Sequence, residues 1–327
     1  MKQKEFSQEK IMFPNVSIII PVKPKGEIEK VIQSLKKVAY PKDKIEVLIV
    51  RGNQPSRQRN KAVKLAKNEI LYFLDNDSMV DKNALNQAVS YINRKDVAAV
   101  GGPALTLPSD SLLQKSFGYV LGSSFGTSET RHRFRSVGKV IKAKGDKLIL
   151  CNLCFKKSIF LKAGGLNEAL YPNEENELLK RLNARGYYFI YNPKMIIYRS
   201  QRATLFAFAR QIFRYGSGRM DHFFYLLSVS DLVFLIPLFF CFYLISLIFW
   251  SNFYYLVPTF IYLFLNLLFS FEAAFQNKNW VSLPLLLFLF PLEHISYGLG
   301  TFWGMIKKIL PSKVRKSKVI IERKRLV

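Results

Sequence analysis

The stretch EILYFLDNDS at residues 69–78 decides the fold of this chain. Its apolar run predicts a buried strand, and the Asp-Asn-Asp that follows predicts a turn at the end of that strand. Two similar runs come before it, at 16–22 and 45–50, and apolar residues recur at helical spacing in 27–38 and 57–67. Strand and helix alternating over about 60 residues predict right-handed crossovers and a parallel sheet.

Asp75 and Asp77 therefore fall where such a sheet binds its ligand, beyond the carboxyl end of a strand. Two carboxylates two residues apart can share one hard cation, and Mg²⁺ or Mn²⁺ takes oxygen ligands and bridges diphosphate oxygens. The same residues are typical of an Asn/Asp turn that only ends a strand. The local pattern leaves both interpretations open.

Two further segments contain residues that suit a catalytic or binding role. A predicted helix at 174–184 begins with Glu174 and Glu175, which suit the positive end of the helix dipole or a general base for an acceptor hydroxyl. On a predicted amphipathic helix, Gln211 and Arg214 lie three residues apart and share a face, so they suit a phosphate, a sugar or lipid headgroups. For the cationic cluster at 131–135 we favour a solvated loop over a phosphate site.

The C-terminal part changes character. Residues 228–306 contain four Asp, Glu, Lys or Arg side chains, and 232–250 and 253–271 are uncharged stretches of membrane-spanning length. We expect these two to cross a membrane and 281–306, which prolines interrupt, to be re-entrant or interfacial. Three spans with an external tail is the alternative. Gly300 and Gly304 predict close helix packing.

The net charge of +26 on 327 residues is concentrated outside the apolar region, and 307–327 alone contains nine cations. Half of the residues are hydrophobic and three are cysteines, which excludes a disordered chain and a disulfide scaffold. The basic residues lie in no recognised nucleic-acid module, so we expect anionic membrane lipid and no nucleic acid as the partner. The opening residues contain no secretory signal, and the basic tail predicts a cytoplasmic side for both ends.

Taken in order, the motifs resemble those of membrane-associated glycosyltransferase family 2, in particular bacterial enzymes of exopolysaccharide or lipid-linked oligosaccharide assembly. The resemblance implies an α/β GT-A fold, Rossmann-like with a mostly parallel sheet, followed by an α-helical membrane region. We expect a GT-A domain at 1–203, an interfacial helix at 204–227, a membrane region at 228–306 and a basic cytoplasmic tail at 307–327. The residues that carry the resemblance are VSIIIPV at 16–22, Arg59-Asn60, EILYFLDNDS at 69–78, Gly164-Gly165-Leu166-Asn167-Glu168, Glu174-Glu175-x-Glu177-Leu178-x-x-Arg181 and Gln211-x-x-Arg214-Tyr215.

The resemblance also implies roles for these residues. Asp75 and Asp77 match the Asp-x-Asp motif, which binds Mg²⁺ or Mn²⁺ and the donor diphosphate. Glu175, with Glu174 beside it, matches the acidic pair that contains the catalytic base. The positions implied at the donor are Pro21, Val22, Arg59, Gln211, Arg214 and Tyr215.

Three positions depart from the family pattern. Arg51 stands where the second strand commonly ends in an Asp that contacts the nucleobase. Tyr215 replaces a Trp. Some members supply a late His to the metal, and here the segment reads Tyr198-Arg199-Ser200.

The predicted function is inverting transfer of a sugar from a nucleotide-diphospho-sugar to a hydroxyl of a lipid-linked or other saccharide acceptor. The predicted place is the inner (cytoplasmic) membrane, with several crossings and the catalytic domain facing the cytoplasm. A processive polysaccharide synthase and a non-enzymatic membrane scaffold are the alternatives.

Overall fold

The computed structural model describes residues 13–170, 173–223, 229–250, 252–309 and 319–326. The chain folds into two compact units. The first comprises Met1–Leu105, His132–Arg199 and Val314–Val327, and the second comprises Thr106–Arg131 and Ser200–Lys313. This division differs from the predicted boundary after residue 203, because 106–131 fold with the C-terminal helices.

The first unit is built on the three strands that the sequence predicts. β1 (Val16–Val22), β2 (Ile45–Arg51) and β3 (Ile70–Leu74) are parallel, with β1 in the middle, and every residue of β1 and β3 is buried. Burial explains why these strands are mainly apolar in sequence, since both faces of the sheet are covered.

Within the described residues, the main sheet has eight strands in the order β11-β2-β1-β3-β8-β5-β9-β7. The predicted mostly parallel sheet is confirmed, because β1, β2, β3, β5 and β9 run in one direction. β8 is inserted antiparallel between β3 and β5, and β7 and β11 are antiparallel edge strands. The further strands are β5 (Val97–Gly101), β7 (Ile141–Ala143), β8 (Asn152–Lys156), β9 (Tyr188–Tyr191) and β11 (Ile320–Lys324), and a small second sheet contains β4 (Met79–Val80), β10 (Ile197–Arg199) and β6 (Ala104–Thr106).

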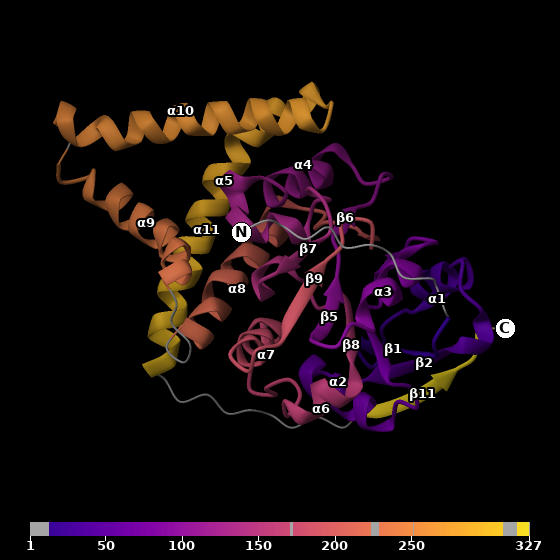
Figure 1. The fold of residues 1–327 in the computed structure, drawn as a ribbon. Coiled ribbons are helices and arrows are strands. Elements are labelled where there is room, and N and C mark those ends of the chain that lie inside the picture. Colours follow the sequence, from indigo (N-terminus) through magenta and orange to yellow (C-terminus); the bar gives the residue numbers. More distant parts are fainter. Residues whose placement is uncertain (1–12, 171–172, 224–228, 251, 310–318, 327) are drawn as a thin grey trace. The chain divides into compact units, whose positions relative to one another are not determined.

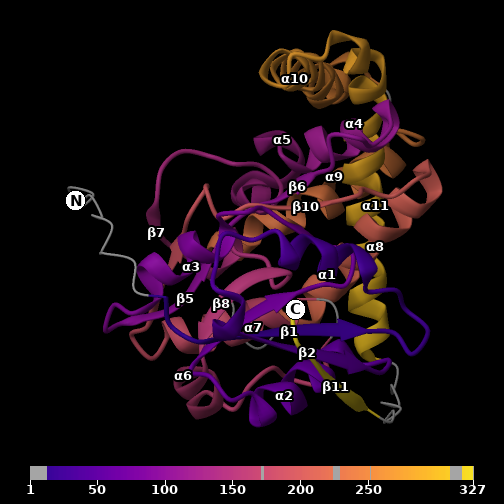
Figure 2. The same cartoon turned by 90° about the vertical axis from the view of Figure 1, so that its right-hand side faces the viewer.

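Helices cover both faces of the main sheet (Figures 1 and 2). Alternate residues of β1 enter different cores: Ile18 and Ile20 pack with α1 and α3, and Ile19 packs with α2, α6 and α7. This three-layer arrangement leaves the carboxyl edge of the strands for function. The helices are α1 (Glu29–Lys36), α2 (Pro55–Leu65), α3 (Ala84–Ile92), α6 (Lys157–Lys162) and α7 (Glu174–Asn183).

The C-terminal strand corrects the prediction of a basic tail at 307–327. β11 pairs antiparallel with β2, from Ile320 opposite Arg51 to Lys324 opposite Val47. Ion pairs fix it, with Arg51 Nε 2.9 Å from a Glu322 oxygen and Arg323 Nε 3.4 Å from a Glu46 oxygen. The charges of this segment therefore suit the exposed edge of a sheet. Residues 310–318 of the predicted tail lie outside the described residues.

The second unit is helical. α8 covers most of the predicted interfacial segment, of which 224–227 lie outside the described residues. α8 packs against α11 through glycines: a Cβ on Gly300 would lie 2.1 Å from the Phe213 carbonyl oxygen, and one on Gly304 would lie 2.6 Å from that of Ser217. The predicted close approach is confirmed. The helices are α4 (Leu112–Leu121), α5 (Ser124–Thr127), α8 (Leu205–Phe223), α9 (Ile236–Ser246), α10 (Phe253–Gln276) and α11 (Leu283–Ile309).

Two of the described helices, α10 and the segment Trp280–Lys307, which includes most of α11, are long and apolar enough to cross a membrane. These two candidate membrane spans differ from the two that the sequence predicts. The helical part of the expected span at 232–250, Leu232–Ser246, is too short to qualify, whereas most of the expected broken segment at 281–306 forms one helix that continues through Pro291. A proline is tolerated in such a helix because neighbouring groups can satisfy the freed carbonyl.

Candidate active site

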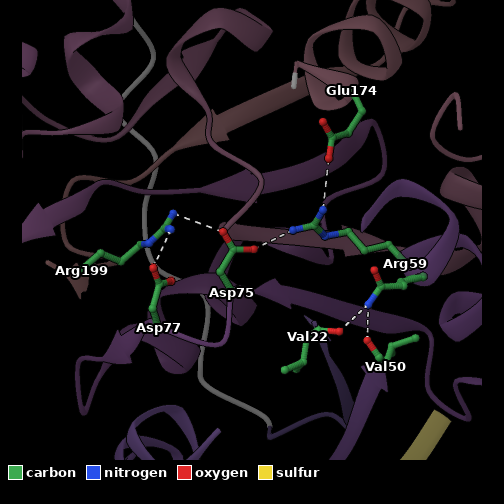
Figure 3. A network of polar contacts seen from close by, with 8 residues as sticks. Val22, Val50, Arg59, Asp75, Asp77, Glu174 and Arg199 are labelled. Atoms are coloured by element: carbon green, nitrogen blue, oxygen red, sulfur yellow. Dashed lines mark hydrogen bonds and ion pairs between the residues drawn. The ribbon is translucent and has the colours of Figure 1, made fainter. Parts of the chain in front are cut away.

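Three segments bring charged side chains together at the carboxyl end of β3 (Figure 3). Asp75 directly follows β3, Arg59 lies in α2, and Glu174 opens α7. Arg59 joins the two carboxylates: its Nη2 donates to Asp75 Oδ1 at 2.7 Å, and its Nη1 donates to Glu174 Oε1 at 3.1 Å. The Asp75 and Glu174 motifs, 99 residues apart in sequence, are therefore linked through one guanidinium group.

Arg199, the last residue of β10, extends this network. Its Nη1 lies 3.2 Å from Asp75 Oδ2, and its Nη2 donates to Asp77 Oδ2 at 2.9 Å. Acidic and basic groups thus alternate along Glu174, Arg59, Asp75, Arg199 and Asp77 (Figure 3).

Burial changes along the network. The side chains of Glu174 and Arg59 are 5% and 4% exposed, whereas those of Arg199 and Asp77 are 26% and 49% exposed. Burial raises the pKa of the Glu174 carboxyl to about 7; the nearby Arg59 charge opposes the rise, and Glu175 adds to it. The Glu174 end is a buried anchor, and the Asp77 end is open to a ligand.

Glu175 faces a different arginine. Arg133 Nη1 lies 3.3 Å from Glu175 Oε1, and Arg133 Nη2 donates to Asn176 Oδ1 at 2.6 Å. The Arg133 side chain is 9% exposed, so the prediction of a solvated loop is wrong at this residue. The sequence at 131–135 shows alternating arginines, and this pattern does not distinguish a buried arginine from an exposed one.

The end of β1 is braced from two sides. Gln58 Nε2 donates to the carbonyls of Val22 and Val50, at the ends of two parallel strands. Arg51 donates to the carbonyls of Pro24 and Gly26, at 3.2 and 3.1 Å, as well as pairing with Glu322 of β11. Arg51, which departs from the family pattern, thus supports the loop after Pro21 and Val22.

The diglycine motif has a structural role. Asn60 donates to the Leu166 carbonyl and accepts from the Leu166 amide, at 2.8 and 2.9 Å. Gly165 has φ of 72°, and a Cβ there would lie 2.7 Å from Asn60 Oδ1. Only glycine meets both conditions, because other residues avoid positive φ. Arg181 secures the same loop by donating to the Ala163 and Gly165 carbonyls.

Gln211, Arg214 and Tyr215 lie on α8 in the second unit. Gln211 accepts from Arg202 Nε at 2.5 Å and donates to the Tyr215 hydroxyl at 2.8 Å, while Arg214 is exposed. The helix therefore links the Gln and Tyr of this motif, as their spacing of four permits. Their role at a donor stays a prediction.

A comparison with protein families shows to which family this chain belongs. The model named glycosyl transferase family group 2 matches residues 70–275, which include both the Asp75 and the Glu174 motifs. The chain belongs to this family. Its fold is accordingly the GT-A-like one expected from the resemblance.

Individual proteins are also similar to this chain. The succinoglycan biosynthesis protein ExoA of Rhizobium meliloti (strain 1021) is 25% identical over 246 residues, covering 66% of this chain and 72% of that protein. Similar solved structures include the mannosyltransferase PcManGT of Pyrobaculum calidifontis in complex with GDP-Man and Mn²⁺, with a TM-score of 0.49, 17% identity and coverage of 66% of this chain and 65% of that chain. Another is S. aureus TarS 1-349 in complex with UDP-GlcNAc, with a TM-score of 0.41, 12% identity and coverage of 88% and 91%. The match to PcManGT spans slightly less than two thirds of that chain.

Asp75 and Asp77 do not, as placed, fit the Mg²⁺ or Mn²⁺ that the resemblance implies for this transferase. Both oxygens of Asp75 and one of Asp77 are engaged by guanidinium groups. Within the part of the chain that the structure describes, no three His, Cys, Asp or Glu residues form a group that could bind a metal. Burial raises the pKa of the nearby Cys151 thiol to about 12, so it stays neutral. Like the role of Arg133, the role of Arg199 was not predicted from the sequence; its one signal was its position where some family members have a His.

Proposed function

We propose that this chain transfers a sugar, with inversion, from a nucleotide-diphospho-sugar to the hydroxyl of a lipid-linked saccharide in envelope or exopolysaccharide assembly. The observation that carries the proposal is the network of alternating carboxylates and guanidinium groups at the carboxyl end of β3. Ligands of open α/β sheets bind at this edge. The family match and the name of the succinoglycan relative support the class of reaction.

In the proposed step, the acceptor oxygen attacks the anomeric carbon from the face opposite the diphosphate. The new carbon–oxygen bond forms as the bond to the diphosphate breaks, and the acceptor proton passes to a glutamate. The nucleoside diphosphate leaves with the electron pair, and its growing charge is stabilised by cationic groups already in position. In many enzymes, such preorganised charge lowers the reaction barrier more than any other effect.

We assign the base to Glu175 and a positioning role to Glu174. Glu174 is committed to Arg59, which in turn orients Asp75, so a proton on Glu174 would loosen the donor end of the site. Glu175 is buried at the start of the same helix and makes a longer contact, 3.3 Å, with Arg133. General-base assistance of this kind contributes roughly 10²- to 10⁴-fold in rate.

For α8 we propose that Arg214 and the linked Gln211 and Tyr215 assist at the donor diphosphate or the acceptor, as the family pattern implies. Arg214 is exposed and can meet a phosphate group, and the Gln211–Tyr215 hydrogen bond stiffens the helix face beside it.

A lipid acceptor is supported by the second unit. Along α10, large apolar side chains are exposed, among them Phe260, Leu263, Phe264 and Leu267, each more than 40% exposed. An apolar surface of this length marks a membrane or a protein interface. A membrane at α10 and α11 would place a polyprenyl-linked acceptor within reach of the chain.

The C-terminal strand supports a topology. β11 completes the same sheet that contains β1 to β3, so both ends of the membrane region must return to one side. We therefore propose an even number of crossings, with the catalytic unit on the cytoplasmic side of the inner membrane.

Labelling tests this topology. The cysteines at 151, 154 and 241 are buried, so an added cysteine can be read against a low background. In intact cells an impermeant maleimide should label Arg325→Cys only after permeabilisation. Labelling of Arg325→Cys in intact cells would rule out the even count.

The activity is tested by incubating the detergent-solubilised full chain with a panel of nucleotide sugars and membrane lipid extract. Transfer of labelled sugar to lipid, with release of nucleoside diphosphate, is the expected result. A chain that binds and turns over no nucleotide sugar would contradict the proposal.

A further inference from the structure

Arg199 occupies the space between the two carboxylates of the Asp-x-Asp motif. Its two terminal nitrogens contact different aspartates, Nη1 with Asp75 at 3.2 Å and Nη2 with Asp77 at 2.9 Å. One guanidinium group thus bridges two acidic side chains, which is the arrangement that a shared divalent cation would otherwise have.

We propose that Arg199 supplies the positive charge that binds the donor diphosphate, so that this chain binds its donor without a divalent metal. The inference rests on the proposed function, because it concerns the donor of that same reaction. The proposed function names the reaction, and the inference names the cation that binds the diphosphate.

The chemistry of the Arg199 side chain suits phosphate binding. A guanidinium group is always protonated, has five N–H donors and matches phosphate oxygens in a bidentate manner. The ion pairs with Asp75 and Asp77 account for one contact at each terminal nitrogen, and 26% of the side chain is exposed, so phosphate oxygens can reach it.

The rest of the network holds Arg199 in place. Asp75, its more buried partner, is fixed on the other side by Arg59 at 2.7 Å, and Arg59 is anchored by Glu174. A cation in a prepared position binds an anion without first being ordered, which is the benefit that a tightly coordinated metal would give.

Binding measurements separate this inference from the proposed function. Calorimetry with the solubilised full chain would use uridine diphosphate and guanosine diphosphate as probes, in EDTA and in Mn²⁺. We expect the better probe to bind equally well in both conditions. Arg199→Ala should weaken it by about ten- to hundredfold, the usual effect of a charge-assisted contact, and Arg199→Lys should weaken it less. Arg185→Ala, an equal loss of charge at an exposed site after α7, should change nothing.

Arg199→His gives a gain of function that no general loss of structure can imitate. Imidazole together with Asp75 and Asp77 forms a ligand set for Mn²⁺, so this variant should bind Mn²⁺ in the absence of nucleotide, and its binding of the diphosphate should become dependent on Mn²⁺. The wild-type chain should bind no Mn²⁺ under the same conditions.

The other possible results separate a failure of the inference from a failure of the proposed function. Wild-type binding of the diphosphate only with Mn²⁺, or an Arg199→Ala affinity equal to that of Arg185→Ala, would overturn the inference and leave the proposed function intact. A chain that binds neither diphosphate and no nucleotide sugar in either condition would overturn the proposed function itself.

Discussion

Replacing Arg59 by methionine tests the buried half of the network. The side chains of Arg59 and Glu174 are 4% and 5% exposed, so the variant leaves a carboxylate in the interior without its cation. Breaking a buried pair in this way costs about 3–5 kcal/mol when the remaining group stays charged. Glu174 can avoid part of that cost by taking up a proton, because burial already raises its pKa to about 7.

The cost of Arg59→Met must therefore depend on pH. In the wild-type chain the folded-state pKa of Glu174 lies above its unfolded value, so its contribution to stability is greatest at low pH and declines until the pH passes about 7. Without Arg59 the folded-state pKa rises further, and the decline continues above pH 7 at about 1.4 kcal/mol per pH unit. The variant should thus be modestly destabilised at pH 6 and lose about 3 kcal/mol more than wild type by pH 9.

Hydrogen exchange read by mass spectrometry on peptides of β3 is the suitable assay. The three tryptophans are all in the second unit, so their fluorescence does not report on this sheet. The double variant Arg59→Met, Glu174→Gln is the matched control, since it has no carboxylate at 174 to titrate. Its free energy of unfolding should therefore not show the additional decline between pH 7 and pH 9. Equal destabilisation at pH 6 and pH 9, or an unchanged slope in the double variant, would refute the reasoning.

Three other changes give clear expectations. Glu175→Gln should reduce transfer at least a hundredfold while calorimetry finds donor binding intact; turnover at the wild-type rate would remove the base assignment. Gly300→Val should destabilise the second unit by about 1–3 kcal/mol through its clash with α8, measured by tryptophan fluorescence in denaturant, whereas the exposed Leu299→Val should have little effect. Glu322→Ala should change the stability of the first unit by less than about 1 kcal/mol in exchange experiments, because its pair with Arg51 is half-exposed, and a larger loss would show that β11 depends on this pair.

The sequence could predict the first half of the fold because its signals are local. Each of the strands β1, β2 and β3 is a mainly apolar run, and the helices between them keep an apolar face. The antiparallel insertion of β8 could not be predicted in this way, because a buried strand has the same pattern in either direction. β11 was missed for a related reason: an edge strand with charged residues resembles a solvated tail until its partner is known.

In the candidate site, too, local sequence patterns do not show which side chains contact one another. The motifs at Asp75 and Glu174 were found from sequence, but their link through Arg59 depends on the packing of α2 against the sheet. Arg133 and Arg199 have no local pattern that distinguishes a buried partner of a carboxylate from a surface cation. Each acquires its role from residues at least 42 positions away.

Electrostatics disfavours a metal beside Arg199 in the donor-free site. Two unit charges about 4 Å apart interact by roughly 4 kcal/mol at an effective dielectric constant near 20, so a dication beside the guanidinium group would be repelled by roughly 8 kcal/mol. Asp75 and Asp77 can offset one positive charge each, and Arg59 already takes part of the charge of Asp75. Before a donor brings its own negative charges, the pair of aspartates does not balance Arg199 and a metal together. A single substitution at 199 should therefore be sufficient to change which cation the site uses.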